Sequence, residues 1–93
     1  NLQLMKLITL IQPTLSLPDL TAICQPEDGI LLRQDAVWLS VRQDISWPVQ
    51  QVYALQSDLL LRGLPEQQHI KIIDDATWVA LTIQAQQVLL WQN

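Results

Sequence analysis

Five short apolar runs recur along the chain, with more polar segments between them. A two-residue hairpin turn cannot fill such gaps, whereas a crossover that carries a helix can, so the spacing predicts parallel strands. Several runs are almost continuously apolar, as expected of strands covered on both faces. The pattern therefore predicts a three-layer α/β/α sandwich with a mostly parallel sheet of four to five short strands. The runs, about 20 residues apart, are Lys6–Ile11, Ile30–Arg33, Val49–Leu55, Ile70–Ile73 and Val88–Trp91.

The first two connecting segments carry helix signals of different quality. Ser16 and Asp19 fit a capping box, which predicts a helix that ends before Pro26. Asp35 can cap a second helix over Ala36–Arg42, although the β-branched and aromatic residues of this segment also suit a strand. The first segment is therefore interpreted as a short helix, and the second stays open between helix and strand.

The last two connecting segments have clearer boundaries. A third helix is predicted over Asp58–Arg62, capped by Ser57 and ended by Gly63 in a left-handed conformation. A fourth is predicted over Ala76–Ala85, capped by Asp74 or Asp75. Its apolar residues occupy a broad part of the helix surface.

Length and composition limit the chain to one small domain. The 93 residues leave no room for a second unit, and we expect the domain to span residues 5–93. Residues 1–4 precede a Met5 that is typical of a natural start, so they are expected to be upstream residues. Apolar residues make up 49% of the chain and charged residues 15%. A domain this small cannot bury all of these apolar residues. This excess predicts a protein partner.

Charge and cysteine content narrow the function further. The net charge is −4 and no stretch gathers basic residues, so the chain alone is not expected to bind nucleic acid. The single cysteine excludes an internal disulfide and favours a reducing, cytoplasmic location. The apolar runs are much shorter than the ~20 residues of a membrane helix, so no membrane span is expected.

Few residues suit catalysis or cofactor binding. Two glycines cannot build a dinucleotide or P-loop motif, and a single histidine, His69, predicts no metal site, so no cofactor is expected. The adjacent Asp74 and Asp75 fit a helix cap better than an acid–base pair. Cys24 is the one sulfur nucleophile, but acidic residues follow it near a helix C-terminus, where the thiolate is disfavoured. Cys24 is therefore only a weak catalytic candidate.

Several blocks of the sequence, in unbroken order from Met5, resemble the TusB/DsrH family of sulfur-relay subunits. The most specific block holds Tyr53, Asp58, Arg62 and Gly63. The remaining blocks are Met5–Leu10, Ile30–Val37, Ile73–Asp74, Trp78–Val79, Leu81–Thr82 and Trp91.

The resemblance implies a DsrE/F/H-like fold and a role in a heterohexamer with TusC- and TusD-type (DsrF/DsrE-like) partners. Such an assembly relays persulfide sulfur toward 2-thiolation of the wobble uridine in tRNA, and its essential cysteine lies on the TusD/DsrE-type partner. A cysteine that some DsrH-branch members carry on the first helix falls on Leu20, and a histidine frequent in TusB-type chains falls on Ala85. The family-motif positions implied for this chain are Tyr53, Asp58, Arg62, Gly63, Asp74 and Trp91.

Three functions are consistent with these observations. The first is a non-catalytic subunit of the sulfurtransferase complex for tRNA thiolation. The second is a DsrH-type subunit of a sulfur-oxidation relay, with Cys24 as a persulfide carrier. The third is a homo-oligomeric module that acts without the other subunits.

Overall fold

A single five-stranded sheet forms the centre of the domain. The computed structural model describes residues 6–14 and 16–91, so the expectation for residues 1–4 and Met5 lies outside them. The strand order is β4-β3-β2-β1-β5, and every neighbouring pair is parallel. Each strand lies within two residues of a predicted run, which confirms the predicted strands and their direction. The strands are β1 (Lys6–Leu10), β2 (Gly29–Leu32), β3 (Gln51–Leu55), β4 (Lys71–Ile73) and β5 (Gln87–Trp91).

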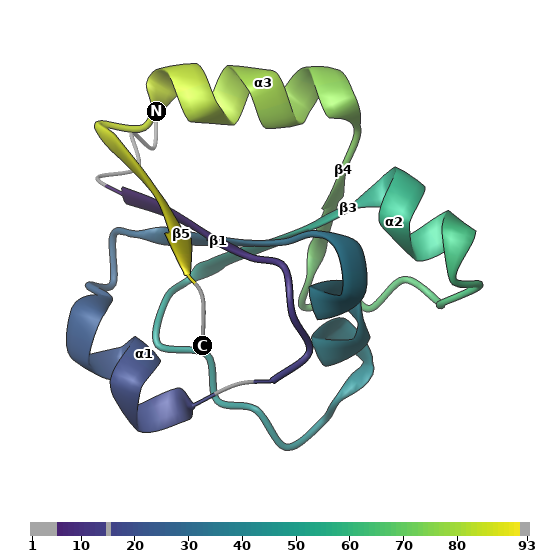
Figure 1. Ribbon diagram of the computed structural model, residues 1–93, viewed down its shortest axis with the longest axis horizontal. Helices are drawn as coiled ribbons and strands as arrows, with labels where there is room; N and C mark the ends of the chain where they lie inside the picture. The colour runs from purple at the N-terminus through teal and green to yellow at the C-terminus, as the bar shows by residue number, and fades with distance from the viewer. Residues whose placement is uncertain (1–5, 15, 92–93) are drawn as a thin grey trace.

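Helices lie on both sides of this sheet, as predicted for a three-layer α/β/α sandwich. Figure 1 shows α3 along one face of the sheet and α1 on the opposite side. The segment that fitted either a helix or a strand is a 3₁₀ helix, η1. The helical elements are α1 (Leu17–Ile23), η1 (Gln34–Val41), α2 (Gln56–Leu61) and α3 (Asp75–Gln84).

Alternate residues of each strand point to opposite faces, and this alternation divides the core into two clusters. The larger cluster joins the sheet to α1, η1 and α2, and includes Ile8, Ile30, Val52, Leu20 and Leu59. The smaller cluster lies on the α3 side, and combines Leu7, Leu31, Tyr53, Leu55 and Ile73 with Trp78, Leu81 and Ala85 of that helix and its C-cap.

The two faces of the sheet are covered unequally. On the side of the smaller cluster, α3 is the packing helix, and none of its residues is fully buried. A helix is about 10 Å across, whereas five strands spaced about 4.8 Å apart span about 19 Å. Val88 and Leu90, which pair with Leu7 and Thr9 in register, therefore stay 46% and 55% exposed on β5.

Three of the expected helix caps are wrong. Ser57 does not cap α2, because this helix begins at Gln56 and Ser57 lies inside it. The other two side chains have different partners. The Ser16 hydroxyl does not cap α1 but donates to Asp19 Oδ2 at 2.9 Å. Asp35 does not cap η1, which begins one residue earlier, at Gln34. Its carboxylate instead pairs with Arg62, far along the sequence. The expected cap of α3 is correct, since Asp74 accepts from the Thr77 amide at 2.8 Å.

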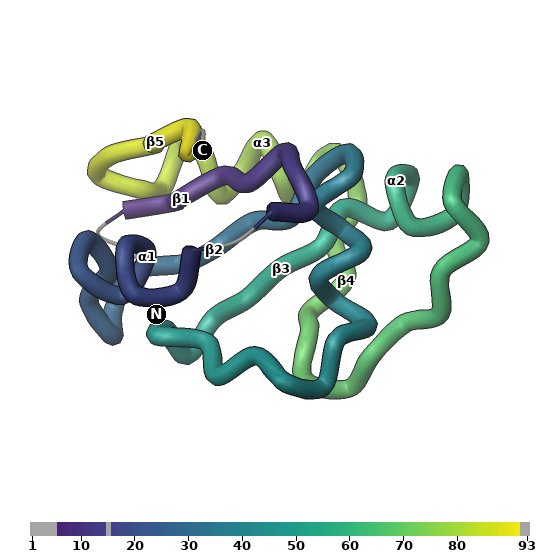
Figure 2. The backbone as a smooth tube through the Cα atoms, turned by 60° about the horizontal axis from the view of Figure 1, so that its bottom comes forward, coloured from purple at the N-terminus to yellow at the C-terminus, as the bar shows by residue number. Residues whose placement is uncertain are grey.

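The first and last strands of the described chain lie side by side. Lys6 pairs with Gln87, and the register continues to Leu10 and Trp91. Between β4 and β5 the chain crosses the whole sheet through α3, from one edge to the other. Figure 2 shows this final crossover returning beside β1, near the beginning of the described chain.

Candidate functional site

An ion-pair cluster, which we call the Arg62 latch, lies beyond the carboxyl ends of β2 and β3. It consists of Asp35, Asp58 and Arg62. Arg62 donates to Asp35 Oδ1 through Nη2 at 2.9 Å and through Nε at 3.1 Å. Its Nη1 donates to the Asp58 carbonyl at 3.2 Å and lies 3.5 Å from Asp58 Oδ1. The latch joins the end of α2 to the start of η1.

Asp58 also fixes the backbone at the entrance of η1. The Gln34 amide donates to Asp58 Oδ2 at 2.9 Å. Gln34 has a φ of +53°, a left-handed conformation that costs a residue with a side chain about 1–2 kcal/mol. A carboxylate from α2 therefore caps a helix that follows another strand, and holds the turn that precedes it. Asp58 and Arg62 also form the i,i+4 ion pair that their spacing on the helix allows, and the hydrogen bond to Gln34 gives Asp58 this second task.

Gly63 terminates α2 in a Schellman motif. Its φ is +64°, as predicted for a left-handed residue at this position. Leu64 N donates to Leu59 O at 3.0 Å and Gly63 N donates to Leu60 O at 3.2 Å, which satisfies two carbonyls at the helix end. Gly63 thus ends the helix directly after Arg62, and so fixes the position of Arg62 at the end of α2.

Tyr53 lies on β3, in the smaller core cluster, and is only 6% exposed. Burial raises the pKa of its phenol above the ordinary value. A neutral, packed tyrosine of this kind stabilises the sheet rather than transferring protons near neutral pH.

A shallow hollow of about 400 Å³ lies at the carboxyl end of β4. Polar side chains of Gln56, Glu66, Lys71, Asp74 and Thr77 contribute to its wall. Hydrogen bonding from Thr77, first from its side chain and then from its backbone amide, is the main reason why the pKa of Asp74 is lowered. Asp74 therefore stays ionised as a helix cap and is poorly suited to act as a general base.

One contact of this region carried no clear signal in the sequence. The guanidinium of Arg33 lies 4.0 Å from the ring centre of Trp78, in a cation–π arrangement that joins the end of β2 to α3. The two residues are far apart along the chain, and their spacing matches no local motif. The resemblance blocks hold both of them, but the residues alone do not predict the contact.

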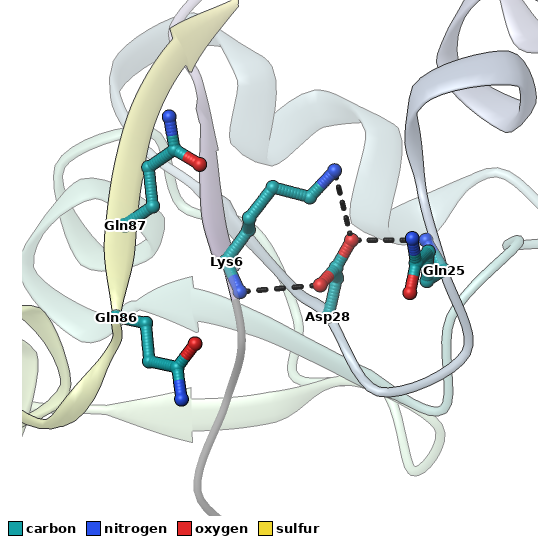
Figure 3. A pocket seen from close by; sticks show the side chains of 5 residues that line it. All are labelled: Lys6, Gln25, Asp28, Gln86 and Gln87. Atoms are coloured by element: carbon teal, nitrogen blue, oxygen red, sulfur yellow. Dashed lines mark hydrogen bonds and ion pairs between the residues drawn. The ribbon is translucent and has the colours of Figure 1, made fainter.

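A buried ion pair lies at the opposite, amino end of the strands. Asp28 is fully buried, and its carboxylate accepts from the Lys6 amide at 3.1 Å and the Gln25 amide at 2.9 Å. The Lys6 ammonium lies 3.3 Å from Asp28 Oδ2 and also donates to the Ile23 carbonyl. Figure 3 shows this pair in a hollow of about 360 Å³ that Gln86 and Gln87 complete from the side of β5.

Cys24 lies beside this pair, at the C-cap of α1, and is partly buried. Burial is the main cause that raises the pKa of its thiol, and the carboxylate of Asp28 raises it further. The Lys6 ammonium lowers the pKa, but this effect is the smallest of the three. The thiolate is thus disfavoured, as the acidic neighbours of Cys24 in the sequence suggested.

The residues singled out from the sequence do not form one site. Asp58, Arg62 and Gly63 meet in and beside the latch, and Asp74 starts α3 at the end of the neighbouring strand β4. Cys24 is at the other end of the strands. Trp91 ends β5 and packs against the larger core cluster. Across residues 6–14 and 16–91, no helix has the length and apolarity that a bilayer crossing requires, and no three potential metal ligands gather.

The fold and these contacts define a small parallel α/β/α domain whose recognisable side chains hold its own elements together. The chain matches the family described as DsrH like protein over residues 12–88, which is most of its length. It therefore belongs to the DsrH-like family of sulfur-relay subunits, whose members work in complexes with DsrE- and DsrF-type partners. Among curated proteins, no sequence matches the chain.

Proposed function

We propose that this chain is a non-catalytic subunit of a sulfur-relay complex that thiolates the wobble uridine of tRNA. Its partners are TusC- and TusD-type proteins in a cytoplasmic heterohexamer. The TusD-type partner supplies the reactive cysteine, and this chain completes the assembly. Membership of the DsrH-like family supports the relay, and the resemblance of the Tyr53–Gly63 block to the TusB/DsrH family agrees with it.

The environment of Cys24 carries this proposal. Sulfur relay requires a thiolate that attacks a donor persulfide, so that the donor thiolate leaves and the terminal sulfur moves to the attacking cysteine. The only cysteine of this chain is partly buried beside the Asp28 carboxylate, and its thiol pKa is raised. Such a thiol is a poor nucleophile near neutral pH.

The family-motif residues support the same conclusion. Asp58 and Arg62 bind each other and the start of η1, Gly63 ends a helix, and Asp74 caps another. Each of these residues is engaged in holding the fold. Because its motif residues stabilise its own fold, the chain fits the role of a subunit that positions a partner.

Cys24→Ser in the reconstituted complex tests the proposal. We expect 2-thiouridine formation, measured by mass spectrometry of the tRNA, within about twofold of wild type. The matched variant replaces the relay cysteine of the TusD-type partner and should abolish transfer. A loss of about tenfold or more with Cys24→Ser would give Cys24 a place in the relay.

The Lys6 ammonium, which lowers the pKa of Cys24, is the one observation that favours the sulfur-oxidation alternative. In that case the purified chain should gain about 32 Da when it is incubated with a persulfide donor. We expect no such adduct. Deletion of the gene separates the two branches, since loss of tRNA 2-thiouridine supports the first and loss of growth on reduced sulfur supports the second.

A further inference from the structure

Apolar side chains gather on one exposed surface formed by α3 and β5, which we call the C-terminal face. On α3, Val79 is 53% exposed and Ile83 is 77% exposed. On β5, Val88 and Leu90 point to the same side of the sheet as α3, and they are also about half exposed. Ala76 and Ala80 extend the outward row of the helix. This surface combines one helix side and one strand.

The C-terminal face carries no charge of its own. From Ala76 to Trp91 the sequence has no acidic or basic residue. The exposed Leu60 and Leu61 of α2 differ in this respect, because they stand between Asp58 and Arg62 in the sequence, and the exposed Trp38 of η1 stands between Asp35 and Arg42. A charged partner surface would lose its hydration against the C-terminal face without gaining an opposite charge. An uncharged, apolar protein surface is therefore the partner surface that best matches the C-terminal face. RNA and charged peptides match it poorly.

The geometry of the sheet indicates what kind of protein this is. A parallel sheet is normally covered on both faces, and α3 leaves the β5 flank of its face open. The outer edge of β5 pairs with no other strand of the described chain. This edge has five residues and neither charge nor proline, whereas the opposite edge, β4, has three residues and carries Lys71. Natural edges that stay free are usually short or charged. The β5 flank is therefore suited to a neighbouring α/β domain.

Net charge also indicates that the partner is a different protein and not a second copy of this chain. Two copies would bring together two bodies that each carry a net charge of −4, and this repulsion opposes self-association. DsrH-like chains work in complexes with DsrE- and DsrF-type partners. We propose that the C-terminal face is the surface on which a DsrE- or DsrF-type partner docks, burying Val79, Ile83, Val88 and Leu90. This inference rests on the proposed function.

The experiment compares two matched substitutions in the complex. Ile83→Glu places a charge near the end of α3 at a side chain that is 77% exposed, and Leu61→Glu does the same at the end of α2 at 79%. Their similar exposure, and their place in the last turn of a helix, make their effects on the free chain similar. Affinity for the DsrE/DsrF-type partner pair is measured by calorimetry, and the assembly by native mass spectrometry.

We expect Ile83→Glu to weaken partner binding about 100-fold or more, because it buries an unpaired charge in the contact. Leu61→Glu should change the affinity by less than about threefold. Leu90→Lys tests the strand independently and should also weaken binding strongly. If Ile83→Glu lowers the melting temperature much more than Leu61→Glu does, Leu90→Lys decides the outcome.

Two results would overturn the inference and leave the proposed function intact. In the first, the Ile83→Glu variant and the Leu90→Lys variant each bind the partners with wild-type affinity. In the second, of the three variants only Leu61→Glu loses binding. A wild-type chain that binds neither partner refutes the proposed function itself. A wild-type homodimer that Ile83→Glu converts to monomer, with partner binding unchanged, assigns the face to a second copy and overturns the docking proposal.

Discussion

The Arg62 latch and the C-terminal face show opposite uses of side chains in one small domain. In the latch, Asp35 and Asp58 are both satisfied by Arg62, so the charges bind within the chain. On the C-terminal face, Val79 and Ile83 have no comparable cover and remain exposed. The recognisable polar residues thus stabilise the fold, whereas the surface available to another protein is made of apolar residues that belong to no motif.

Removal of the Asp58 carboxylate should have the largest effect on the isolated chain. Asp58→Ala leaves the Gln34 amide without its acceptor and removes one of the two carboxylates that pair with Arg62, so we expect a loss of about 2 kcal/mol in the free energy of unfolding. Urea denaturation followed by circular dichroism measures this loss. Asp44→Ala, which breaks a solvent-exposed pair with Arg42, should have a much smaller effect. Equal effects would show that the latch is an ordinary surface pair.

Gly63→Ala tests the residue that ends α2 next to the Arg62 latch. A Cβ at Gly63 would meet no atom within 4 Å, so the cost comes from the left-handed backbone alone. We expect a loss of about 1 kcal/mol, measured by the same denaturation. Gly63→Asn should cost less, since asparagine adopts this conformation more readily. A neutral Gly63→Ala would mean that the end of α2 relaxes without strain.

Asp74→Ala removes the N-terminal cap of α3, the helix that carries Val79 and Ile83. The pKa of Asp74 is lowered in the folded chain, chiefly by the hydrogen bond from Thr77. A lowered folded-state pKa means that the carboxylate stabilises the protein above its unfolded pKa of about 3.9, and that this contribution is lost as the pH falls through the folded-state value. The variant should therefore be less stable than wild type at pH 7, by less than Gly63→Ala. A stability difference that stays constant down to pH 2.5 would contradict the cap.

The smallest effect is expected on the C-terminal face itself. Ile83→Glu should change the unfolding free energy of the isolated chain by less than about 0.5 kcal/mol, because this side chain is already 77% exposed. Thermal denaturation without partners measures the change. A loss as large as that of Asp58→Ala would show that Ile83 stabilises the monomer, and the contrast between the two regions would disappear.

The sequence predicted the strands well because their signal is local. The five apolar runs lie within two residues of the observed strands, and the gaps between them correctly indicated parallel pairing. The strand order was not predictable in this way, since any order of parallel strands gives the same runs. The Gly63 turn and the Asp74 cap were also predicted, because each depends on neighbours within about five residues.

The missed features depend on contacts between distant segments. Asp35 has the residue type and position of a cap, but Arg62 binds its carboxylate and Asp58 serves the start of η1 instead. The row Ala76, Val79, Ala80 and Ile83 has the period of a core-facing helix side, yet it points outward. The smaller core cluster is instead reached by Trp78, Leu81 and Ala85. Periodicity locates an apolar side of a helix without telling which neighbour covers it.

Because β1 pairs with β5, the sheet cannot be completed until β5 has been synthesised. The ribosome makes β1 first and β5 last among the described strands, and β1 lacks its second neighbour until β5 has been synthesised. A nascent chain stopped before β5 leaves one side of β1 open in an otherwise formed sheet. A partner that recognises β5 together with α3 would therefore capture chains in which β5 has been synthesised and ignore shorter ones.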